Sequence, residues 1–143
     1  MARFEATTGR YVYLTVQGVE YRVYFEEAGA GIPLVCQHTA GSDGKQWRHF
    51  LTDPDITGRF RVIVPDLPYH GKSLPPESVE WWAREYRLTK SFFIEFHVAL
   101  KRALGADNPV FAVAIYTNNI TTVTNKIVIG GSFATFNGTA RNC

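Results

Sequence analysis

The chain has 143 residues and a formal net charge of +2, with 45% hydrophobic, 14% aromatic and 20% charged residues. This length suits one domain with a buried core, and the aromatic content favours packed structure over disorder. The charge gives no support to a nucleic-acid or membrane partner. There is no apolar run of the roughly 18 residues that a membrane span needs, and no signal-like N-terminus. We therefore expect a cytoplasmic protein.

The first elements form a predicted antiparallel hairpin. In residues 11–16, tyrosine and threonine alternate with valine and leucine, which is the two-residue period of a half-buried strand. A Gln-Gly turn at 17–18 precedes a second strand, expected at 21–27. Short segments that are apolar on both faces predict buried strands at 33–37 and 60–66.

Two helices are expected as well. The chain enters one near Lys45, and a second spans 88–105, where apolar residues recur every three or four positions along one stripe. Thr89 is suited to cap its start, and Gly105 its end. With a further buried strand at 108–116, strands and helices alternate after the hairpin. This order predicts an α/β sheet, mostly parallel, with helices on its faces.

No metal and no cofactor are expected. The two cysteines, Cys36 and Cys143, lack the spacing of a metal site or a disulfide framework. The stretch IVPDLPYHGKS, residues 63–73, ends in the Gly-Lys-Ser of a phosphate-binding loop. That motif needs a glycine where Asp66 stands and a helix where 74–76, Leu-Pro-Pro, follow. Nucleotide binding is therefore not predicted.

The same stretch fits another pattern. A buried strand followed by Pro-Asp-x-x-x-His-Gly-x-Ser, residues 65–73, resembles the segment after the fourth strand of the α/β-hydrolase superfamily. Upstream, residues 21–50 resemble the second and third strands of that family and the loop after them. Together these segments cover roughly residues 11–111. The resemblance implies a partial, truncated α/β-hydrolase sheet, with an N-terminal antiparallel hairpin followed by parallel strands and flanking helices.

The resemblance also implies roles for loop residues. The loop after the 33–37 strand lies where the family has a His-Gly turn that supplies a backbone N–H to the oxyanion hole, which implies Thr39 and Ala40 as donors. One such donor is worth about a hundredfold in rate. The family's glycine is replaced by Thr39 here. His38, Asp66 and His70 are expected to organise the loops, not to act as acid and base.

The nucleophile of such a hydrolase is a serine in a Gly-x-Ser-x-Gly turn after the fifth strand. At that place the chain instead reads AVAIYTNNITTVTN, residues 112–125, and Gly-Gly-Ser-Phe-Ala follows only at 130–134. Two readings stay open. Ser132 is the nucleophile, displaced by an inserted loop, or these residues form an ordinary turn.

No base can be assigned to Ser132. The family's order is Ser, then Asp or Glu, then His, yet residues 133–143 contain none of these acids or bases. We expect residues 1–111 to be the N-terminal half of a hydrolase domain and 112–143 a divergent tail from a diverted reading frame. The protein is then of esterase-like lineage but catalytically incomplete.

The parent reaction would transfer the acyl group of a small-molecule ester or a related substrate to water. The alternative is a non-catalytic binding or regulatory domain that associates through an exposed sheet edge, and a third reading is an unstable product without function. Truncation also predicts self-association through that edge. It further predicts a partly uncovered helix stripe at Phe92, Phe93 and Phe96.

Overall fold

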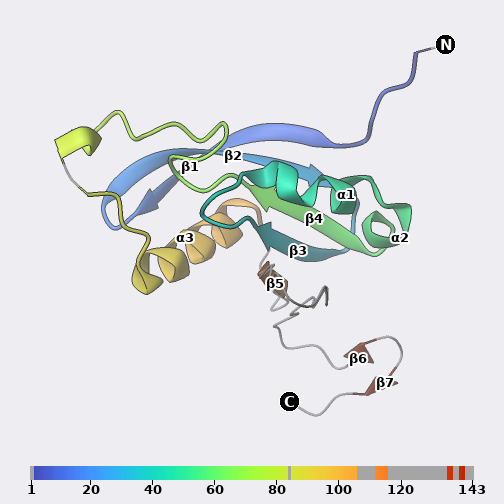
Figure 1. Cartoon of the computed structure of the whole chain (residues 1–143). Helices are drawn as coiled ribbons and strands as arrows, with labels where there is room; N and C mark the ends of the chain where they lie inside the picture. The colour runs from blue at the N-terminus through green and yellow to red at the C-terminus, as the bar shows by residue number, and fades with distance from the viewer. Residues whose placement is uncertain (1, 84, 106–111, 116–134, 137–138, 141–143) are drawn as a thin grey trace, which may run out of the picture.

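The computed structural model describes residues 2–83 and 85–105, and the backbone of the strands at 112–115, 135–136 and 139–140. Its main feature is a five-stranded sheet in the order β1-β2-β4-β3-β5 (Figure 1). A two-stranded antiparallel pair, β6 with β7, is separate from this sheet. The strands are β1 (Thr8–Val16), β2 (Val19–Ala28), β3 (Ile32–Gln37), β4 (Phe60–Pro65), β5 (Ala112–Ile115), β6 (Thr135–Phe136) and β7 (Thr139–Ala140).

The predicted hairpin is confirmed. Strands β1 and β2 pair antiparallel up to Val16 opposite Val19, so the turn is the two-residue Gln17-Gly18. Both turn residues have positive φ, 51° and 75°, as a hairpin turn that matches the strand twist requires. Leu14 and Val16 of β1 are buried and Val12 is partly buried, whereas its tyrosines are exposed. The two-residue alternation therefore selects the face that packs on the core.

The remaining strands form a mixed sheet. Strands β4, β3 and β5 are parallel to one another, as expected, but β4 pairs antiparallel with β2. The short connection at 29–31 reverses the chain between β2 and β3, so β4, which is parallel to β3, must oppose β2. Half of the four pairings are therefore antiparallel. Strands β1 and β5 are the edges of the sheet as described, and self-association through an edge stays a prediction.

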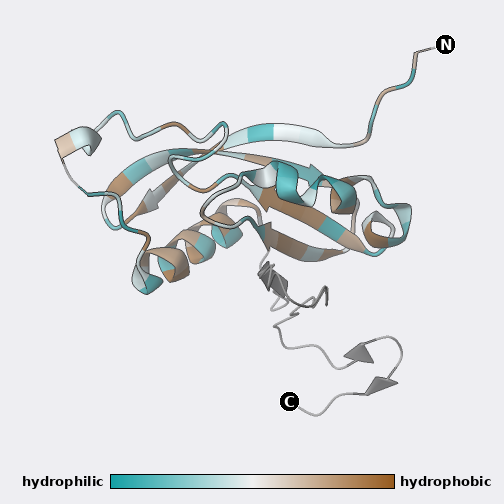
Figure 2. Ribbon diagram, in the orientation of Figure 1, coloured by the Kyte–Doolittle hydropathy of each residue, from teal (hydrophilic) through white to brown (hydrophobic). Residues whose placement is uncertain are grey.

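Helices cover both faces of the sheet. On one face lie η1 (Gly44–Trp47), α1 (Arg48–Thr52) and α2 (Pro54–Thr57), and on the other lies α3 (Lys90–Ala103) (Figure 1). A short η2 (Trp81–Ala83) interrupts the loop before α3. Figure 2 shows hydrophobic residues concentrated along β3 and β4, which lie between these layers. None of the helices in the described part of the chain is long and apolar enough to cross a membrane.

Helix α3 packs its apolar stripe on the β1–β2 hairpin and the sheet. Phe92 and Phe96 are 5% and 0% exposed, so the prediction of a partly uncovered stripe is wrong for these two residues, whereas Phe93 is only partly buried. The hairpin covers the two buried rings: Phe92 contacts Tyr21 edge to face, and the Glu95 carboxylate accepts the N–H of Gln17 at 2.7 Å. The predicted helix start is confirmed, because the side chain of Thr89 caps the first turn.

A buried carboxylate ties the end of α3 to the sheet. Glu27, on β2, is 7% exposed and accepts hydrogen bonds from Arg10 and Arg61. Arg61 also donates to the carbonyl of Leu104, the C-terminal cap of α3, at 3.0 Å. A buried charge is tolerated only when it is paired and hydrogen-bonded, and Glu27 meets both conditions. The ion pair of Glu27 with Arg61 thereby holds the C-terminal end of α3 next to β4.

Replacing the fully buried ring at Phe96 will test this packing. We expect Phe96→Ala to lower the free energy of unfolding by about 3–5 kcal/mol, because it leaves a cavity between α3 and the sheet. The matched control is Ile94→Ala on the same helix, whose side chain is 57% exposed, with an effect within about 0.5 kcal/mol. Urea unfolding followed by circular dichroism measures both. Equal effects would contradict the packing described.

Candidate functional site

Two loops meet at the carboxyl ends of neighbouring parallel strands. The first follows β3 at Gln37, and the second follows β4 at Pro65. In open α/β sheets, ligands bind at this end of the strands. Five of the six site residues predicted from the sequence lie in these two loops: His38, Thr39, Ala40, Asp66 and His70. The sixth, Ser132, lies outside the described residues, as does the elbow-like turn around it.

The imidazole of His38 joins the two loops. The ring is 1% exposed, and its Nε2 accepts the backbone N–H of Leu67 at 2.9 Å. Because a nitrogen that accepts cannot carry a proton, Nδ1 holds the single proton and donates it to the carbonyl of Thr39 at 2.8 Å. Burial lowers the pKa of His38, which favours the neutral ring that this pattern needs.

The His38 contact sets the direction of the next peptide group. The Thr39 carbonyl also accepts the N–H of Ser42 at 3.0 Å, so this oxygen is held on the inner side of the loop. In a trans peptide the carbonyl and the following N–H point in opposite directions. The N–H of Ala40 is therefore directed away from the His38 ring. Among the described residues it has no hydrogen-bond acceptor.

The two expected oxyanion donors differ in availability. The N–H of Thr39 donates to the side-chain oxygen of Gln46, on η1, at 3.0 Å. The N–H of Ala40 stays open to a ligand within the described part of the chain. Gln46 was not singled out in the sequence, because nothing in the local pattern shows that an amide seven residues later reaches back to the loop. Of the two, Ala40 is the donor that can meet a carbonyl oxygen without first breaking a bond.

A second histidine holds the other side of Ala40. The Nε2 of His70 lies 2.9 Å from the Ala40 carbonyl oxygen, and its Nδ1 lies 2.9 Å from the Pro68 carbonyl oxygen. The rings of His38 and His70 are 5.0 Å apart between centroids. The Tyr86 hydroxyl donates to the same Pro68 carbonyl at 2.8 Å. Both peptide groups that flank the Ala40 Cα are thus fixed by imidazole rings.

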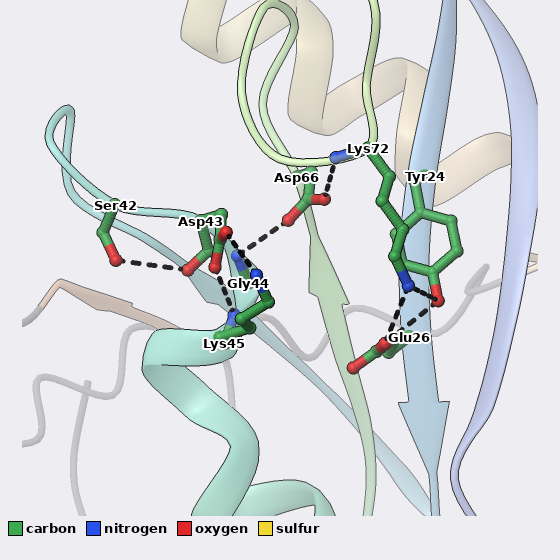
Figure 3. Close-up of polar contacts among 8 residues, drawn as sticks. All are labelled: Tyr24, Glu26, Ser42, Asp43, Gly44, Lys45, Asp66 and Lys72. Carbon is green, nitrogen blue, oxygen red and sulfur yellow. Dashed lines mark hydrogen bonds and ion pairs between the residues drawn. The ribbon is translucent and has the colours of Figure 1, made fainter.

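The carboxylate of Asp66 binds main chain from both sides. It is 5% exposed and accepts the N–H of Gly44 and the N–H of Lys72, each at 2.7 Å (Figure 3). Gly71, the residue before Lys72, has φ 51°, and a Cβ at this position would lie 2.2 Å from a carboxylate oxygen of Asp66. Only glycine leaves room for the Asp66 carboxylate at this position. The Gly-Lys-Ser sequence therefore forms a turn whose Lys72 N–H donates to that carboxylate.

An open pocket of about 210 Å³ lies beside Asp66. Its lysines already have acidic neighbours: Lys45 Nζ is 3.3 Å from Asp43, and Lys72 Nζ is 3.0 Å from the Tyr24 hydroxyl and 3.8 Å from Glu26 (Figure 3). Both ammonium groups therefore lie beside acidic side chains of the protein itself. Within residues 2–83 and 85–105, no group of three or more His, Cys, Asp or Glu side chains could hold a metal ion.

A further histidine lies under this end of the sheet. His97, on α3, is partly buried, and its Nε2 is 2.6 Å from the side-chain oxygen of Gln37, the last residue of β3. Burial lowers its pKa to about 4, so the ring is neutral at neutral pH. No site role was predicted for His97 from the sequence. The sequence did contain a signal for this position. His97 lies next to the buried stripe of α3, and this position directs its side chain toward the sheet.

Comparison with known proteins agrees with this arrangement. A family model described as "alpha/beta hydrolase fold" matches residues 32–115, which is more than half of the chain. The chain belongs to the α/β-hydrolase family. The match includes β3, β4, both site loops and β5. The family assignment made from the Pro-Asp-x-x-x-His-Gly-x-Ser pattern is thereby confirmed.

Two curated relatives of this α/β-hydrolase chain are hydrolases. A 2-hydroxy-6-oxononadienedioate/2-hydroxy-6-oxononatrienedioate hydrolase of Paraburkholderia phymatum is 38% identical over 72 residues. A 2-hydroxy-6-oxo-6-phenylhexa-2,4-dienoate hydrolase of Burkholderia cepacia is 29% identical over 72 residues. In each case the match covers 48% of this chain and 25% of the relative. The chain thus spans about a quarter of the length of these relatives.

Solved structures of hydrolases share the fold. An epoxide hydrolase of Vigna radiata matches with a TM-score of 0.58 at 23% identity, over 79% of this chain and 33% of that one. A thermophilic esterase of Thermogutta terrifontis matches with a TM-score of 0.59 at 24% identity, over 73% and 36%. At such identities the likeness concerns the α/β-hydrolase fold alone.

The Asp66 contacts give a stability prediction. In Asp66→Asn one oxygen becomes an NH₂ group that faces a backbone N–H, so one buried donor loses its acceptor. We expect a loss of about 2–3 kcal/mol in the free energy of unfolding. Asp55→Asn, at an exposed position in α2, is the control and should change it by less than about 0.5 kcal/mol. Chemical denaturation of both variants at neutral pH measures the difference. An Asp66→Asn variant as stable as the parent protein would contradict the prediction.

His97 gives a pH prediction. Its pKa falls from 6.5 in the unfolded chain to about 4 in the fold, so the unfolded state binds more protons between these values. The free energy of unfolding should therefore fall as pH drops from 6.5 to 4. We expect His97→Gln to show a shallower fall, while exposed His49→Gln keeps the parent slope. Urea unfolding at half-unit pH steps measures it, and parallel curves for all three chains would refute it.

Proposed function

We propose that this chain forms the oxyanion-binding side of an α/β-hydrolase active site, for small-molecule substrates that carry a carbonyl group. The observation that carries the proposal is the N–H of Ala40. It lies at the carboxyl end of a parallel strand, lacks an acceptor among the described residues, and has its direction fixed by His38. A preorganised donor of this kind stabilises negative charge as it develops on a carbonyl oxygen.

The relatives support a carbonyl substrate. The two hydrolases above are named for 2-hydroxy-6-oxo dienoates and dienedioates, which contain an oxo group. An ester also contains a carbonyl oxygen. Hydrolysis of an ester and hydrolysis of an oxo compound would therefore both require a hydrogen-bond donor for the oxyanion. In this proposal His38, Asp66 and His70 organise the loops around that donor and take no direct part in proton transfer.

Turnover needs a nucleophile and a base in addition to the donor. Ser132 stays the proposed nucleophile, and residues 133–143 offer neither an acid nor a histidine to activate it. A serine without a base is a weak nucleophile at neutral pH. We therefore propose that the 143-residue polypeptide by itself binds a carbonyl oxygen but does not turn over esters.

A binding experiment tests the donor. Benzoate, whose carboxylate oxygen stands in for the oxyanion, should shift the amide signal of Ala40 in ¹⁵N-labelled protein. Ala40→Pro removes this N–H and should weaken binding at least about tenfold, the loss of roughly one charge-assisted hydrogen bond. Gly41→Pro, which removes the neighbouring N–H, is the matched control and should bind as the parent does. Equal binding by all three chains would place the ligand elsewhere.

An activity experiment tests the second part. The 143-residue polypeptide should hydrolyse p-nitrophenyl butyrate no faster than its Ser132→Ala variant, since residues 133–143 supply no acid or histidine to take the serine proton. A serine-directed fluorophosphonate should likewise leave Ser132 unlabelled. Hydrolysis that disappears in Ser132→Ala would show an activated serine and would refute the proposed silence, while leaving the Ala40 result unaffected.

A further inference from the structure

The ring of His70 lies between two carbonyl oxygens. Its Nε2 is 2.9 Å from the Ala40 oxygen, and its Nδ1 is 2.9 Å from the Pro68 oxygen. Carbonyl oxygens only accept hydrogen bonds, whereas a neutral imidazole carries one N–H and one lone pair. Both contacts can be hydrogen bonds at the same time only when the ring holds two protons. The geometry around His70 is therefore that of a cationic ring.

The neighbouring ring has the opposite requirement. His38 faces one donor, the Leu67 N–H, and one acceptor, the Thr39 carbonyl, so a ring with a single proton satisfies both. Its pKa is lowered, first by burial and also by the positive charge of His70. With 5.0 Å between their centroids, two charged rings would repel each other. A neutral His38 removes that repulsion and permits a charge on His70.

Other titratable groups surround the two rings. Tyr86, from the segment before α3, lies 6.1 Å from the His70 ring between centroids, and Tyr69 precedes it in the chain. Asp66, in the same loop, and Asp43, at the start of η1, act on the facing His38 ring with negative charge. The Lys72 ammonium is engaged with the Tyr24 hydroxyl. The two carboxylates oppose the effect of burial on His38, but burial is the larger effect and the pKa of that ring stays lowered.

We propose that His70 is a positioning residue that works in its doubly protonated form, as a cationic clamp on Ala40. The proposal rests on the function proposed above, because Ala40 is the residue whose N–H would meet the carbonyl oxygen. With two protons, the ring holds the Ala40 and Pro68 carbonyls together. When one proton leaves, a nitrogen lone pair faces a carbonyl oxygen and that contact is lost. Order in the loop should therefore be greater when the ring carries two protons than when it carries one.

The ring protons of His70 provide the first test. In ¹⁵N-labelled protein at pH 5.5, we expect two slowly exchanging ring N–H signals from His70, one for each carbonyl. At pH 8 we expect one at most. Over this range His97, with a pKa of about 4, stays neutral, and the lowered pKa of His38 favours one ring proton. A single protected ring N–H on His70 at both pH values would overturn the clamp.

Amide exchange in the loop provides the second test. Thr39 and Ser42 are the loop residues whose N–H groups have acceptors, so their protection reports loop order. After correction for intrinsic rates, we expect about tenfold more protection at pH 5.5 than at pH 8, equivalent to roughly 1.4 kcal/mol. His70→Gln should remove this pH dependence, because a Gln side chain has no charge to lose. The exposed control His49→Gln should keep it.

The outcomes separate the clamp from the proposed function. Protection that is independent of pH, or that changes equally in His70→Gln, overturns the clamp. If His70→Gln does not fold, the ring signals of the parent protein decide. Benzoate that fails to shift Ala40 at either pH, while loop protection follows the His70 ring, refutes the proposed function and leaves the clamp in place. Benzoate that binds more tightly at pH 5.5 than at pH 8, in the parent only, supports both.

Discussion

The hydrogen bond from Leu67 to the buried ring of His38 is the interaction on which the site depends. It joins the loop after β3 to the loop after β4, and it fixes which ring nitrogen carries the proton. The proton on the other nitrogen then holds the Thr39 carbonyl, and the planarity of the peptide turns the Ala40 N–H outward. One neutral imidazole thus determines the direction of a backbone donor that it does not touch.

The surrounding loops are held by side chains that bind main chain. Asp66 accepts two amides, Ser73 donates to the Asp66 carbonyl at 2.7 Å, and Gln46 accepts the Thr39 N–H. Loops lack the repeating hydrogen bonds of helices and strands, so their buried backbone groups need such partners. This explains why three of the buried polar residues, His38, Asp66 and Ser73, lie in the loops after β3 and β4, away from the two apolar clusters on the sheet faces.

This arrangement also explains why the Gly-Lys-Ser sequence is not a phosphate loop. A phosphate loop directs several free N–H groups at an anion. Here the N–H of Lys72 already binds the protein's own anion, the Asp66 carboxylate, and the glycine before it has the positive φ that lets the turn close. The carboxylate occupies the place that a phosphate would need. The motif therefore serves to fix the loop in which His70 lies.

The sequence by itself determined the local structure of the described chain. Alternation in β1 and β2, the apolar stripe and Thr89 cap of α3, and the Pro-Asp-x-x-x-His-Gly-x-Ser pattern gave the hairpin, the helix and the family, because each depends on residues that are close in the chain. The tertiary structure alone decided the antiparallel pairing of β4 with β2 and the burial of the α3 stripe under the hairpin.

The same division holds for the site. The sequence placed His38, Ala40, Asp66 and His70 in the two loops through the family pattern, yet it could not show that Gln46 occupies the Thr39 N–H. Nor could it show which ring nitrogen of His38 carries the proton, since this follows from Leu67, which is 29 residues from His38, or that His70 lies against Ala40, which is 30 residues from it. Hydrogen-bond partners far apart in the chain are fixed only when the sheet brings its strand ends together, so donor direction and protonation belong to the tertiary structure.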